Sequence, residues 1–305
     1  MSHPEISIIL PTFNRAQSIG STIKNVLSQS FTNFELIIIN DGSTDQTDKM
    51  IAIYQKKDAR IVYVENKQNY GCAQSRNIGL QHARAETITF MDDDDQYIDD
   101  ETLKCLYSKM KHECCDLVIS NYKVGDDLKR MDKFGQNFKY NIIKSPGPFL
   151  QSVLIKKSFV TKTGVAFDSH AIPSEDWDFF ITISKLNPIV SYCMCASFKW
   201  NLNQNSQSLD FLKEANALAY ICKKHKNYIT TNLNSKIMSS HYRRAARVYE
   251  KTETINQVNV FYKKAFKEYP YSIKNIFYFI MAVIGYSKTK NCIKWMRKIR
   301  GIPNE

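Results

Sequence analysis

Short apolar runs alternate with amphipathic stretches along the first 120 residues, and this alternation limits the fold more than any other feature. The runs are rich in isoleucine and valine and stop at polar or turn-forming residues. We therefore read them as buried strands at 6–10, 34–39, 61–64, 87–91 and 116–120. The stretches between them carry apolar residues at helical spacing. Successive strand–helix units predict an α/β fold with a doubly wound, mainly parallel sheet and helices on both faces.

Polar clusters directly follow three of these predicted strands, at 12–15, 41–43 and 92–95. In open α/β sheets, ligands bind beyond the carboxyl ends of the strands. We therefore expect a functional site where these clusters meet.

The pattern is less regular beyond residue 120. Residues 122–147 are polar and contain three glycines, which predicts an irregular or hairpin excursion. A helix is expected near 157–163 and a strand over 190–200, and from residue 210 onward the pattern is helical.

Four consecutive carboxylates, Asp92, Asp93, Asp94 and Asp95, are the sharpest chemical feature of the sequence. A divalent cation relieves the repulsion between such groups, and carboxylate oxygens suit Mg²⁺ or Mn²⁺. A diphosphate and water would complete the coordination of the ion. The alternative is a solvated acidic turn that caps a helix. The position of the run after a buried strand favours the metal site.

Glu175 and Asp176 form a second acidic pair, placed at the start of a predicted helix. A carboxylate here can simply cap the helix. It can also act as a general base that removes the proton of an acceptor hydroxyl. One base near the acceptor and one metal near a leaving diphosphate suffice for a single in-line displacement, whereas a glycosidase needs two carboxylates that flank one bond.

Five motifs in order give the chain a family resemblance. They are ISIILPTFNR at the start, NDGSTDQT, RNIGL, FMDDDDQY and SEDWDFF, and together they span roughly residues 5–205. With these motifs the chain resembles glycosyltransferase family 2, whose members have the GT-A fold and use nucleotide sugars. The resemblance implies a mixed, mainly parallel GT-A sheet over residues 1–209, and a UDP-sugar as the donor.

The resemblance also implies which residues bind the donor nucleotide. Pro11, Thr12 and Asn14 match the segment that holds the nucleobase end. Asp41 matches the carboxylate that accepts a hydrogen bond from a uracil ring nitrogen. Arg76 matches a basic residue near the nucleotide, although an exposed helix arginine is the alternative.

The acidic run matches the DxD motif of the family. The resemblance places Asp92 toward the ribose, and Asp94 toward the diphosphate and the Mn²⁺ or Mg²⁺ ion. Asp93 fills the variable middle position, where many relatives have a small residue, so the local field is more negative here. Asp95 matches a common fourth acid that we expect to be structural.

Two further roles follow from the resemblance, together with one departure from the family pattern. Asp176 matches the catalytic base, and Glu175 its companion at the acceptor site. Relatives often carry an aromatic–Arg–x–His pattern near Phe198, but this chain has Lys199 and no histidine there. A histidine metal ligand from this segment is therefore not expected.

The charge of the chain is unevenly distributed. Residues 1–209 carry 23 Lys and Arg against 24 Asp and Glu, whereas residues 210–305 carry 19 against 6. A nucleic-acid binder would spread its positive charge over the binding surface, and no nucleic-acid motif is present, so we expect no nucleic-acid partner. We predict a catalytic domain over 1–209 and a helical basic region over 210–305.

An apolar run at 276–286 lies within the basic region. It is too short to span a bilayer and is followed by a basic cluster. The cluster contains Lys288, Lys290, Lys294, Arg297, Lys298 and Arg300. An apolar segment beside basic residues suits an anionic membrane surface, and the alternative is a buried C-terminal helix.

The hypothesis that this segment contacts a membrane also indicates what the acceptor is and where the protein is located. Bacterial relatives with such tails assemble surface polysaccharide, such as O-antigen or capsule, on a polyprenyl-diphosphate carrier. The start of the chain lacks the features of a signal peptide. We therefore expect a cytoplasmic protein, peripheral on the inner face of the cell membrane, that acts on a lipid-linked saccharide.

Two other functions fit the sequence less well. A sugar nucleotidyltransferase would carry a Gly-rich phosphate loop early in the chain, and residues 11–15 lack its glycines. A catalytically silent carbohydrate- or membrane-binding protein would not need the complete acidic set. The eight cysteines form no zinc-site spacing, so we expect reduced thiols packed mostly in the core.

Overall fold

The computed structural model describes residues 3–200, 210–252 and 254–286 of the chain. It divides into two compact units. Unit one comprises Met1–Ser169 and Glu175–Gln204, and unit two comprises His170–Ser174 and Asn205–Glu305.

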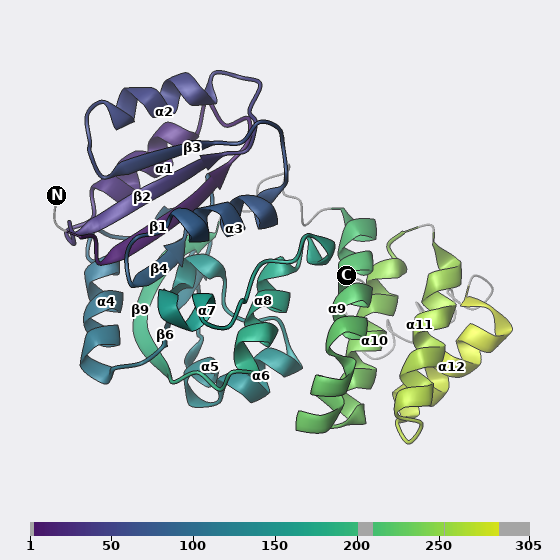
Figure 1. The fold of residues 1–305 in the computed structure, drawn as a ribbon. Helices are drawn as coiled ribbons and strands as arrows, with labels where there is room; N and C mark the ends of the chain where they lie inside the picture. The colour runs from purple at the N-terminus through teal and green to yellow at the C-terminus, as the bar shows by residue number, and fades with distance from the viewer. Residues whose placement is uncertain (1–2, 201–209, 253, 287–305) are drawn as a thin grey trace. The chain divides into compact units, whose positions relative to one another are not determined.

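A nine-stranded sheet forms the centre of unit one within the described part of the chain (Figure 1). The strand order is β3-β2-β1-β4-β8-β6-β9-β5, and β7 pairs with β6 outside this path. The strands are β1 (Ile6–Thr12), β2 (Phe34–Asn40), β3 (Ile61–Glu65), β4 (Thr87–Phe90), β5 (Gln96–Tyr97), β6 (Leu117–Val124), β7 (Asp127–Lys129), β8 (Val153–Lys156) and β9 (Val190–Trp200).

The longest pairings in this sheet are parallel. β1 pairs in parallel with β2 and β4, β2 with β3, and β6 with β9. The antiparallel pairings are shorter and come from β8, which lies between β4 and β6, and from β5 and β7. The predicted mixed, mainly parallel sheet is therefore confirmed.

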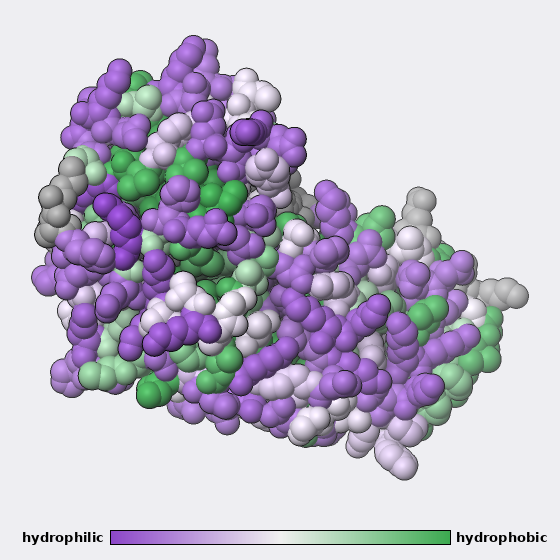
Figure 2. Space-filling view, viewed as in Figure 1, coloured by the Kyte–Doolittle hydropathy of each residue, from purple (hydrophilic) through white to green (hydrophobic). Residues whose placement is uncertain are grey.

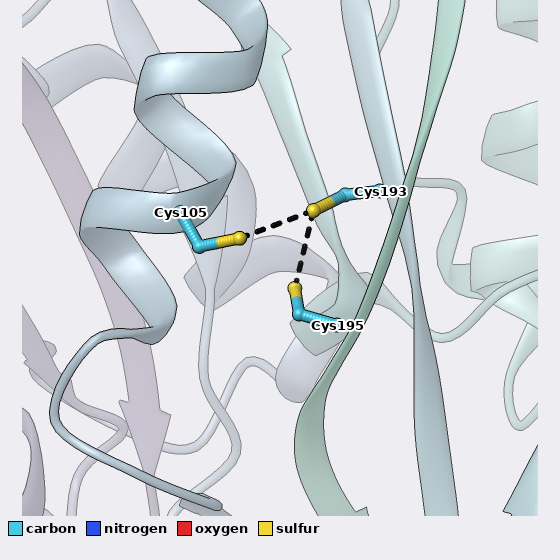
Figure 3. Close-up of side chains that lie close together, drawn as sticks. All are labelled: Cys105, Cys193 and Cys195. Atoms are coloured by element: carbon cyan, nitrogen blue, oxygen red, sulfur yellow. Dashed lines mark hydrogen bonds between the residues drawn. The ribbon is translucent and has the colours of Figure 1, made fainter.

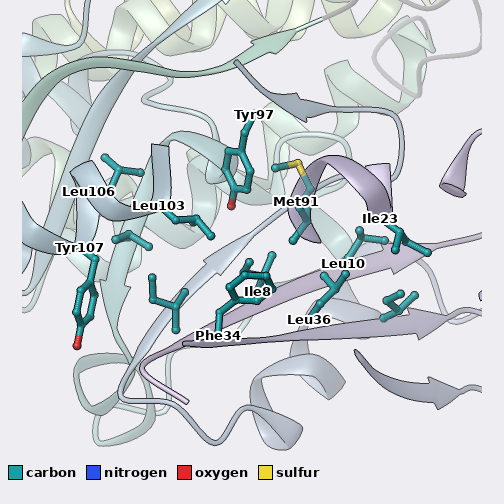
Figure 4. Packing of buried hydrophobic residues seen from close by; sticks show 14 of the residues in the cluster. Ile8, Leu10, Ile23, Phe34, Leu36, Met91, Tyr97, Leu103, Leu106 and Tyr107 are labelled. Atoms are coloured by element: carbon teal, nitrogen blue, oxygen red, sulfur yellow. The ribbon is translucent and has the colours of Figure 1, made fainter. Parts of the chain in front are cut away.

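Helices cover both faces of the sheet because the side chains of the buried strands alternate between them. Ile8 and Leu10 of β1 lie in one core cluster with Ile23 of α1 (Ile19–Leu27) and Leu103 of α4 (Thr102–Glu113), and Figure 4 shows these side chains. Ile9 points to the opposite face, where α3 packs against β1. The helices of unit one are α1 (Ile19–Leu27), α2 (Thr47–Gln55), α3 (Cys72–His82), α4 (Thr102–Glu113), α5 (Asp132–Gln136), α6 (Phe138–Lys144), α7 (Lys157–Thr161) and α8 (Glu175–Ser184).

The segment 122–147 was only partly predicted. Its first part is the expected hairpin, formed by β6 and β7. The rest folds into α5 and α6 rather than irregular chain. Phe134 and Ile142 of these helices are buried, so apolar packing compensates for their short length and polar composition. The strands β5 and β8 were not predicted, because two and four residues are too few to establish a period.

Unit two is helical, as predicted, in its described part. Its helices are α9 (Phe211–Asn232), α10 (Ser235–Tyr249), α11 (Ile255–Glu268) and α12 (Ile273–Ile284). No helix among the described residues has both the length and the apolar character needed to cross a bilayer. The basic cluster over 288–300 lies outside the described residues.

One side of α12 is apolar and exposed to solvent. Its outward residues recur at spacings of three and four, so they form one stripe along the helix. The exposed fractions are 83% for Ile273, 42% for Ile276, 49% for Ile280, 59% for Val283 and 56% for Ile284. Figure 2 shows hydrophobic side chains over the region of α12, which Figure 1 locates at the right of the view.

Candidate active site

The loops after β1 and β2 are joined at Asn14. Its backbone lies in the left-handed region (φ 54°), which asparagine tolerates better than most residues. The amide N–H of Asn14 donates to Ser43 Oγ (2.9 Å), and its side-chain oxygen accepts from the Thr44 amide (2.8 Å). Gly42 also has a positive φ, and a Cβ there would lie 2.6 Å from the backbone of Gln68. These constraints fix the edge of the site.

Pro11 and Thr12 end β1 and are both buried. The Met91 amide donates to the Ile9 carbonyl, so the backbone of Ile9 bonds toward β4. Pro11 is two residues further along, so its backbone nitrogen also points to the β4 side, beyond the last residue of β4. The missing N–H of proline therefore leaves no gap in the sheet. The Thr12 carbonyl accepts from the Asp41 amide (2.9 Å), which ties the end of β1 to the loop after β2.

Asp41 is buried and anchors the start of α3. Its Oδ1 accepts from the Asn66 side chain (2.7 Å) and the Tyr70 amide (3.0 Å). Its Oδ2 accepts from the Gly71 amide (2.8 Å). These bonds use three of the roughly four lone-pair positions of a carboxylate, so one further donor can be accommodated.

Asp92 is held by two side chains from distant parts of the chain. Its Oδ1 accepts from Arg76 Nη2 (2.8 Å), and its Oδ2 accepts from Gln151 Nε2 (2.6 Å). Gln151 also donates to Asp95 Oδ2 (2.8 Å). Burial, followed by the charge of Asp92, raises the pKa of Asp95 to about 9. This shift favours the neutral form of Asp95, which reduces the repulsion within the run.

Asp93 pairs with Arg15. Arg15 Nε lies 3.0 Å from Asp93 Oδ1, and Thr22 Oγ1 donates to the Asp93 carbonyl (3.0 Å). Burial raises the pKa of Asp93 to about 6, against the opposing effect of Arg15. Asp93 therefore contacts the loop after β1 and the first helix.

Arg76 links the acidic run to the second acidic pair. It lies on α3 and is 5% exposed. Its Nη1 donates to Glu175 Oε1 (2.6 Å), while its Nη2 binds Asp92. Burial lowers the pKa of Arg76, but the charges of Asp92 and Glu175 outweigh it, and the pKa lies well above its usual value. The alternative of an exposed helix arginine is wrong.

Glu175 and Asp176 begin α8, as the sequence predicted. Glu175 Oε1 accepts from Arg76 and from the Cys72 thiol (3.3 Å). Its Oε2 is buried, and no described residue donates a hydrogen bond to it. This oxygen is therefore a buried acceptor whose hydrogen-bonding capacity the described part of the chain leaves unsatisfied.

Asp176 has an ionisation suited to a base. Its Oδ1 accepts from the Trp177 amide (2.6 Å). Burial, followed by the charge of Glu175, raises the pKa of Asp176 to about 7. A carboxyl with such a pKa is close to the optimum for proton transfer at neutral pH.

Asp94 is the carboxylate that best fits a metal ligand. Its side chain is 34% exposed, and its Oδ2 lies 3.8 Å from Arg15 Nη2. Both oxygens of Asp92 are hydrogen-bonded to Arg76 and Gln151. Within the described residues, the carboxylates of the site do not converge on one point as a set of three ligands. A Mg²⁺ or Mn²⁺ ion here would therefore draw most of its ligands from a diphosphate and water.

Two residues of the site were not found from the sequence. Arg15 lies inside the first motif, but its pairing with Asp93 crosses 78 residues. Gln151 lies in the irregular middle of the chain, and nothing in its neighbourhood signals a role. Only the fold brings its amide to Asp92 and Asp95.

Comparison with known proteins gives a family and a fold. The family model described as glycosyl transferase family 2 matches residues 7–172, which is more than half of the chain. A UDP-Glc:alpha-D-GlcNAc-diphosphoundecaprenol beta-1,3-glucosyltransferase, WfgD of Escherichia coli, is 29% identical over 213 residues, or 68% of this chain and 81% of that protein. The chain spans less of some longer relatives, including 17% and 38% of two glycosyltransferases of Streptococcus pneumoniae.

Two solved structures share the fold at low sequence identity. Residues 1–349 of TarS from S. aureus in complex with UDP-GlcNAc match with a TM-score of 0.68 and 18% identity, over 87% of this chain and 81% of that one. The mannosyltransferase PcManGT of Pyrobaculum calidifontis, in complex with GDP-Man and Mn²⁺, matches with a TM-score of 0.58 and 15% identity. That match covers 93% of this chain and 87% of that one.

Proposed function

The chain belongs to glycosyl transferase family 2, and on this basis we propose that it transfers a sugar from a UDP-sugar to a hydroxyl of a lipid-linked saccharide, with inversion. One observation carries the proposal. Arg76 joins Asp92, at the predicted donor side, to Glu175, which precedes the predicted base in the chain. This link supports a single site for the predicted donor-binding and acceptor-binding groups.

The nucleotide is assigned to the loops after β1 and β2. Asp41 keeps about one acceptor position beyond its three protein hydrogen bonds, which suits the N–H of a uracil ring. Pro11, Thr12 and Asn14 lie on the same edge, and hydrogen bonds fix the loops relative to each other. Preformed loops lower the cost of ordering a bound nucleotide.

The diphosphate is assigned to the acidic run. Asp94 would hold a Mn²⁺ or Mg²⁺ ion, and such an ion neutralises the charge that develops on a leaving diphosphate. Arg15 and Arg76 place positive charge beside Asp93 and Asp92, so the protein itself offsets part of the negative field. Mn²⁺ in the PcManGT complex supports this assignment by fold analogy only.

Asp176 is assigned the role of general base. The acceptor hydroxyl gives its proton to the Asp176 carboxylate, and its oxygen bonds to the anomeric carbon. The bond from that carbon to the diphosphate breaks, and UDP leaves with the bonding electrons. Attack opposite the leaving group inverts the carbon. Glu175 positions Arg76 through the ion pair between them.

The acceptor is assigned by analogy and by surface chemistry. WfgD, by its name, acts on a diphosphoundecaprenol-linked sugar, which is a lipid-linked saccharide. The exposed stripe of α12, together with the basic sequence after residue 286, suits the surface of an anionic membrane. We therefore place the enzyme in surface glycan synthesis, peripheral on the inner face of the membrane.

A transfer assay tests the function. The full chain is incubated with Mn²⁺, individual UDP-sugars and a synthetic GlcNAc-diphospholipid, and both UDP and the glycolipid product are measured. We expect UDP release and product formation with one donor, both abolished by chelation of the metal and by Asp176→Asn. Formation of UDP-sugar from UTP and a sugar phosphate would instead indicate a nucleotidyltransferase. Donor binding without turnover would indicate a silent binding protein.

A vesicle assay tests the membrane assignment. In the full chain, Ile273, Ile280 and Val283 are replaced by serine, and Val260→Ser on α11 serves as a control with a similarly exposed apolar side chain. Removing three apolar contacts of roughly 1 kcal/mol each should weaken partitioning onto anionic vesicles roughly 100-fold. Equal partitioning of the triple variant and the control would show that the exposed side of α12 does not bind the membrane.

A further inference from the structure

Three cysteine side chains from two elements of unit one converge on a single point (Figure 3). Cys105 lies on α4, and Cys193 and Cys195 lie on β9. The pairing of β9 with β6 shifts register directly after Cys193, and this irregularity brings the side chains of Cys193 and Cys195 together. The Cys105 and Cys193 sulfur atoms are 3.2 Å apart, and those of Cys193 and Cys195 are 3.3 Å apart.

Packing alone accounts poorly for this arrangement. The sulfur atoms are closer than the roughly 4 Å at which apolar side chains normally touch. An S–H group is only a weak hydrogen-bond donor, so the two contacts that Cys193 makes with Cys105 and Cys195 gain little from hydrogen bonding. Cys193 is 7% exposed, whereas Cys105 and Cys195 are partly open to solvent. A small ion can therefore reach the sulfur atoms.

We propose that Cys105, Cys193 and Cys195 bind a zinc ion through three thiolates, with water as the fourth ligand. Zinc takes thiolate sulfur at about 2.3 Å in a tetrahedral arrangement, which places ligand sulfur atoms roughly 3.8 Å apart. All three sulfur atoms lie within 4.8 Å of one another. Sub-ångström adjustments of the side chains would therefore bring them to the required spacing.

The surroundings support an ion with three thiolates. Lys109 lies one helical turn after Cys105 on α4 and is ion-paired with Glu113 of the same helix, so it offsets only part of the negative charge of a zinc–thiolate group. A disulfide would use only two of the three sulfur atoms and would need a separation of about 2.05 Å. Three converging thiols match a metal site better than a disulfide.

The proposed zinc would connect α4 to β9. The strand β9 pairs with β5, which directly follows the acidic run of the active site. The ion would therefore stabilise the side of the sheet that supports this run without belonging to the reacting groups. Sequence spacing could not reveal such a site, because 88 residues separate Cys105 from Cys193.

Zinc stoichiometry tests the proposal. The full chain is reduced, loaded with zinc in excess Mg²⁺ to occupy the carboxylate site, and passed through a desalting column. We expect one zinc per chain, and a roughly 100-fold or greater loss of affinity in Cys193→Ser and in Cys105→Ser. Cys114→Ser is the matched control, because Cys114 is an exposed cysteine at the end of the same helix. It should bind zinc like the unaltered chain.

Alkylation of the unaltered chain tests the proposed zinc site in a way that does not depend on whether the cysteine variants fold. Iodoacetamide labelling with and without zinc is read out by peptide mass spectrometry. Zinc should slow the labelling of Cys105 and Cys195 at least about 10-fold and leave Cys114 unchanged. Substoichiometric zinc, equal loss in the Cys114→Ser control, or unprotected Cys105 and Cys195 would overturn the proposal. A Cys105–Cys193 disulfide in freshly purified chain would overturn it as well.

Discussion

The Asp176→Asn substitution should remove activity and, at the same time, stabilise the protein above neutral pH. Burial and the charge of Glu175 raise the pKa of Asp176 to about 7, from an ordinary value of 3.8. The folded chain thus holds this proton more tightly than the unfolded chain. Its ionisation therefore costs stability, beginning near pH 4 and reaching its full extent above about pH 7.

The raised pKa of Asp176 sets an upper limit on this loss of folding stability. A shift of about three pKa units corresponds to roughly 4 kcal/mol. The side chain is only half-buried, and solvent screens part of its charge, so we expect about 1–2 kcal/mol. Asparagine keeps the shape and an acceptor oxygen for the Trp177 amide but carries no charge. At pH 8 the variant should melt roughly 3–6 °C above the unaltered chain, and at pH 4 the two should coincide.

Activity measured on the same samples completes the test. Loss of a general base lowers turnover roughly 10²- to 10⁴-fold, while donor affinity should stay within about 2-fold. The turnover of the unaltered chain should fall as the pH drops below about 7, because the base is then protonated. Unchanged turnover in the variant, or a melting difference that does not depend on pH, would refute the reasoning.

Three further substitutions probe the fold, the network and the metal site. Gly79→Ala places a Cβ 2.3 Å from Ile9 Cγ2 and should destabilise unit one by about 1–3 kcal/mol. An unchanged melting temperature would contradict the packing of α3 on β1. Arg76→Lys cannot reach Asp92 and Glu175 with two nitrogens at once and should lower turnover at least roughly 10-fold, so full activity would show that the bridge is dispensable. Asp94→Asn should raise the Mn²⁺ concentration for half-maximal turnover at least about 10-fold. Asp95→Asn should not raise it, because asparagine is a neutral replacement for an acid whose neutral form is favoured. Equal effects of the two substitutions would show that Asp94 is not the specific metal ligand.

The fold was predictable because its signals are local. The isoleucine-rich runs of β1 and β2 are continuous and have clear ends, and the strand expected over 190–200 matches β9. The helices α5 and α6 were missed because their amphipathic faces are only five and seven residues long. Tertiary packing of Phe134 and Ile142, rather than any local pattern, determines them.

The site was predictable only where a motif carried it. The acidic run and the Glu175–Asp176 pair were visible as chemistry, and their roles remain predictions. Their connection through Arg76 was not visible, because it joins residues 16 and 99 positions away along the chain. The contacts of Gln151 and of the three converging cysteines were not visible for the same reason. The sheet brings together side chains that are far apart in the sequence, and their spacing along the chain does not predict the contact.

The stereochemistry of donor hydrolysis tests the central claim most directly, because it needs no knowledge of the acceptor. The full chain is incubated with Mn²⁺ and UDP-α-glucose or UDP-α-GlcNAc, and the free sugar is followed by proton NMR before it mutarotates. With water in the place of the acceptor hydroxyl and Asp176 as the base, the β-anomer should appear first, and Asp176→Asn should release neither anomer. First appearance of the α-anomer, or equal release by the Asp176→Asn variant, would contradict the proposed in-line displacement.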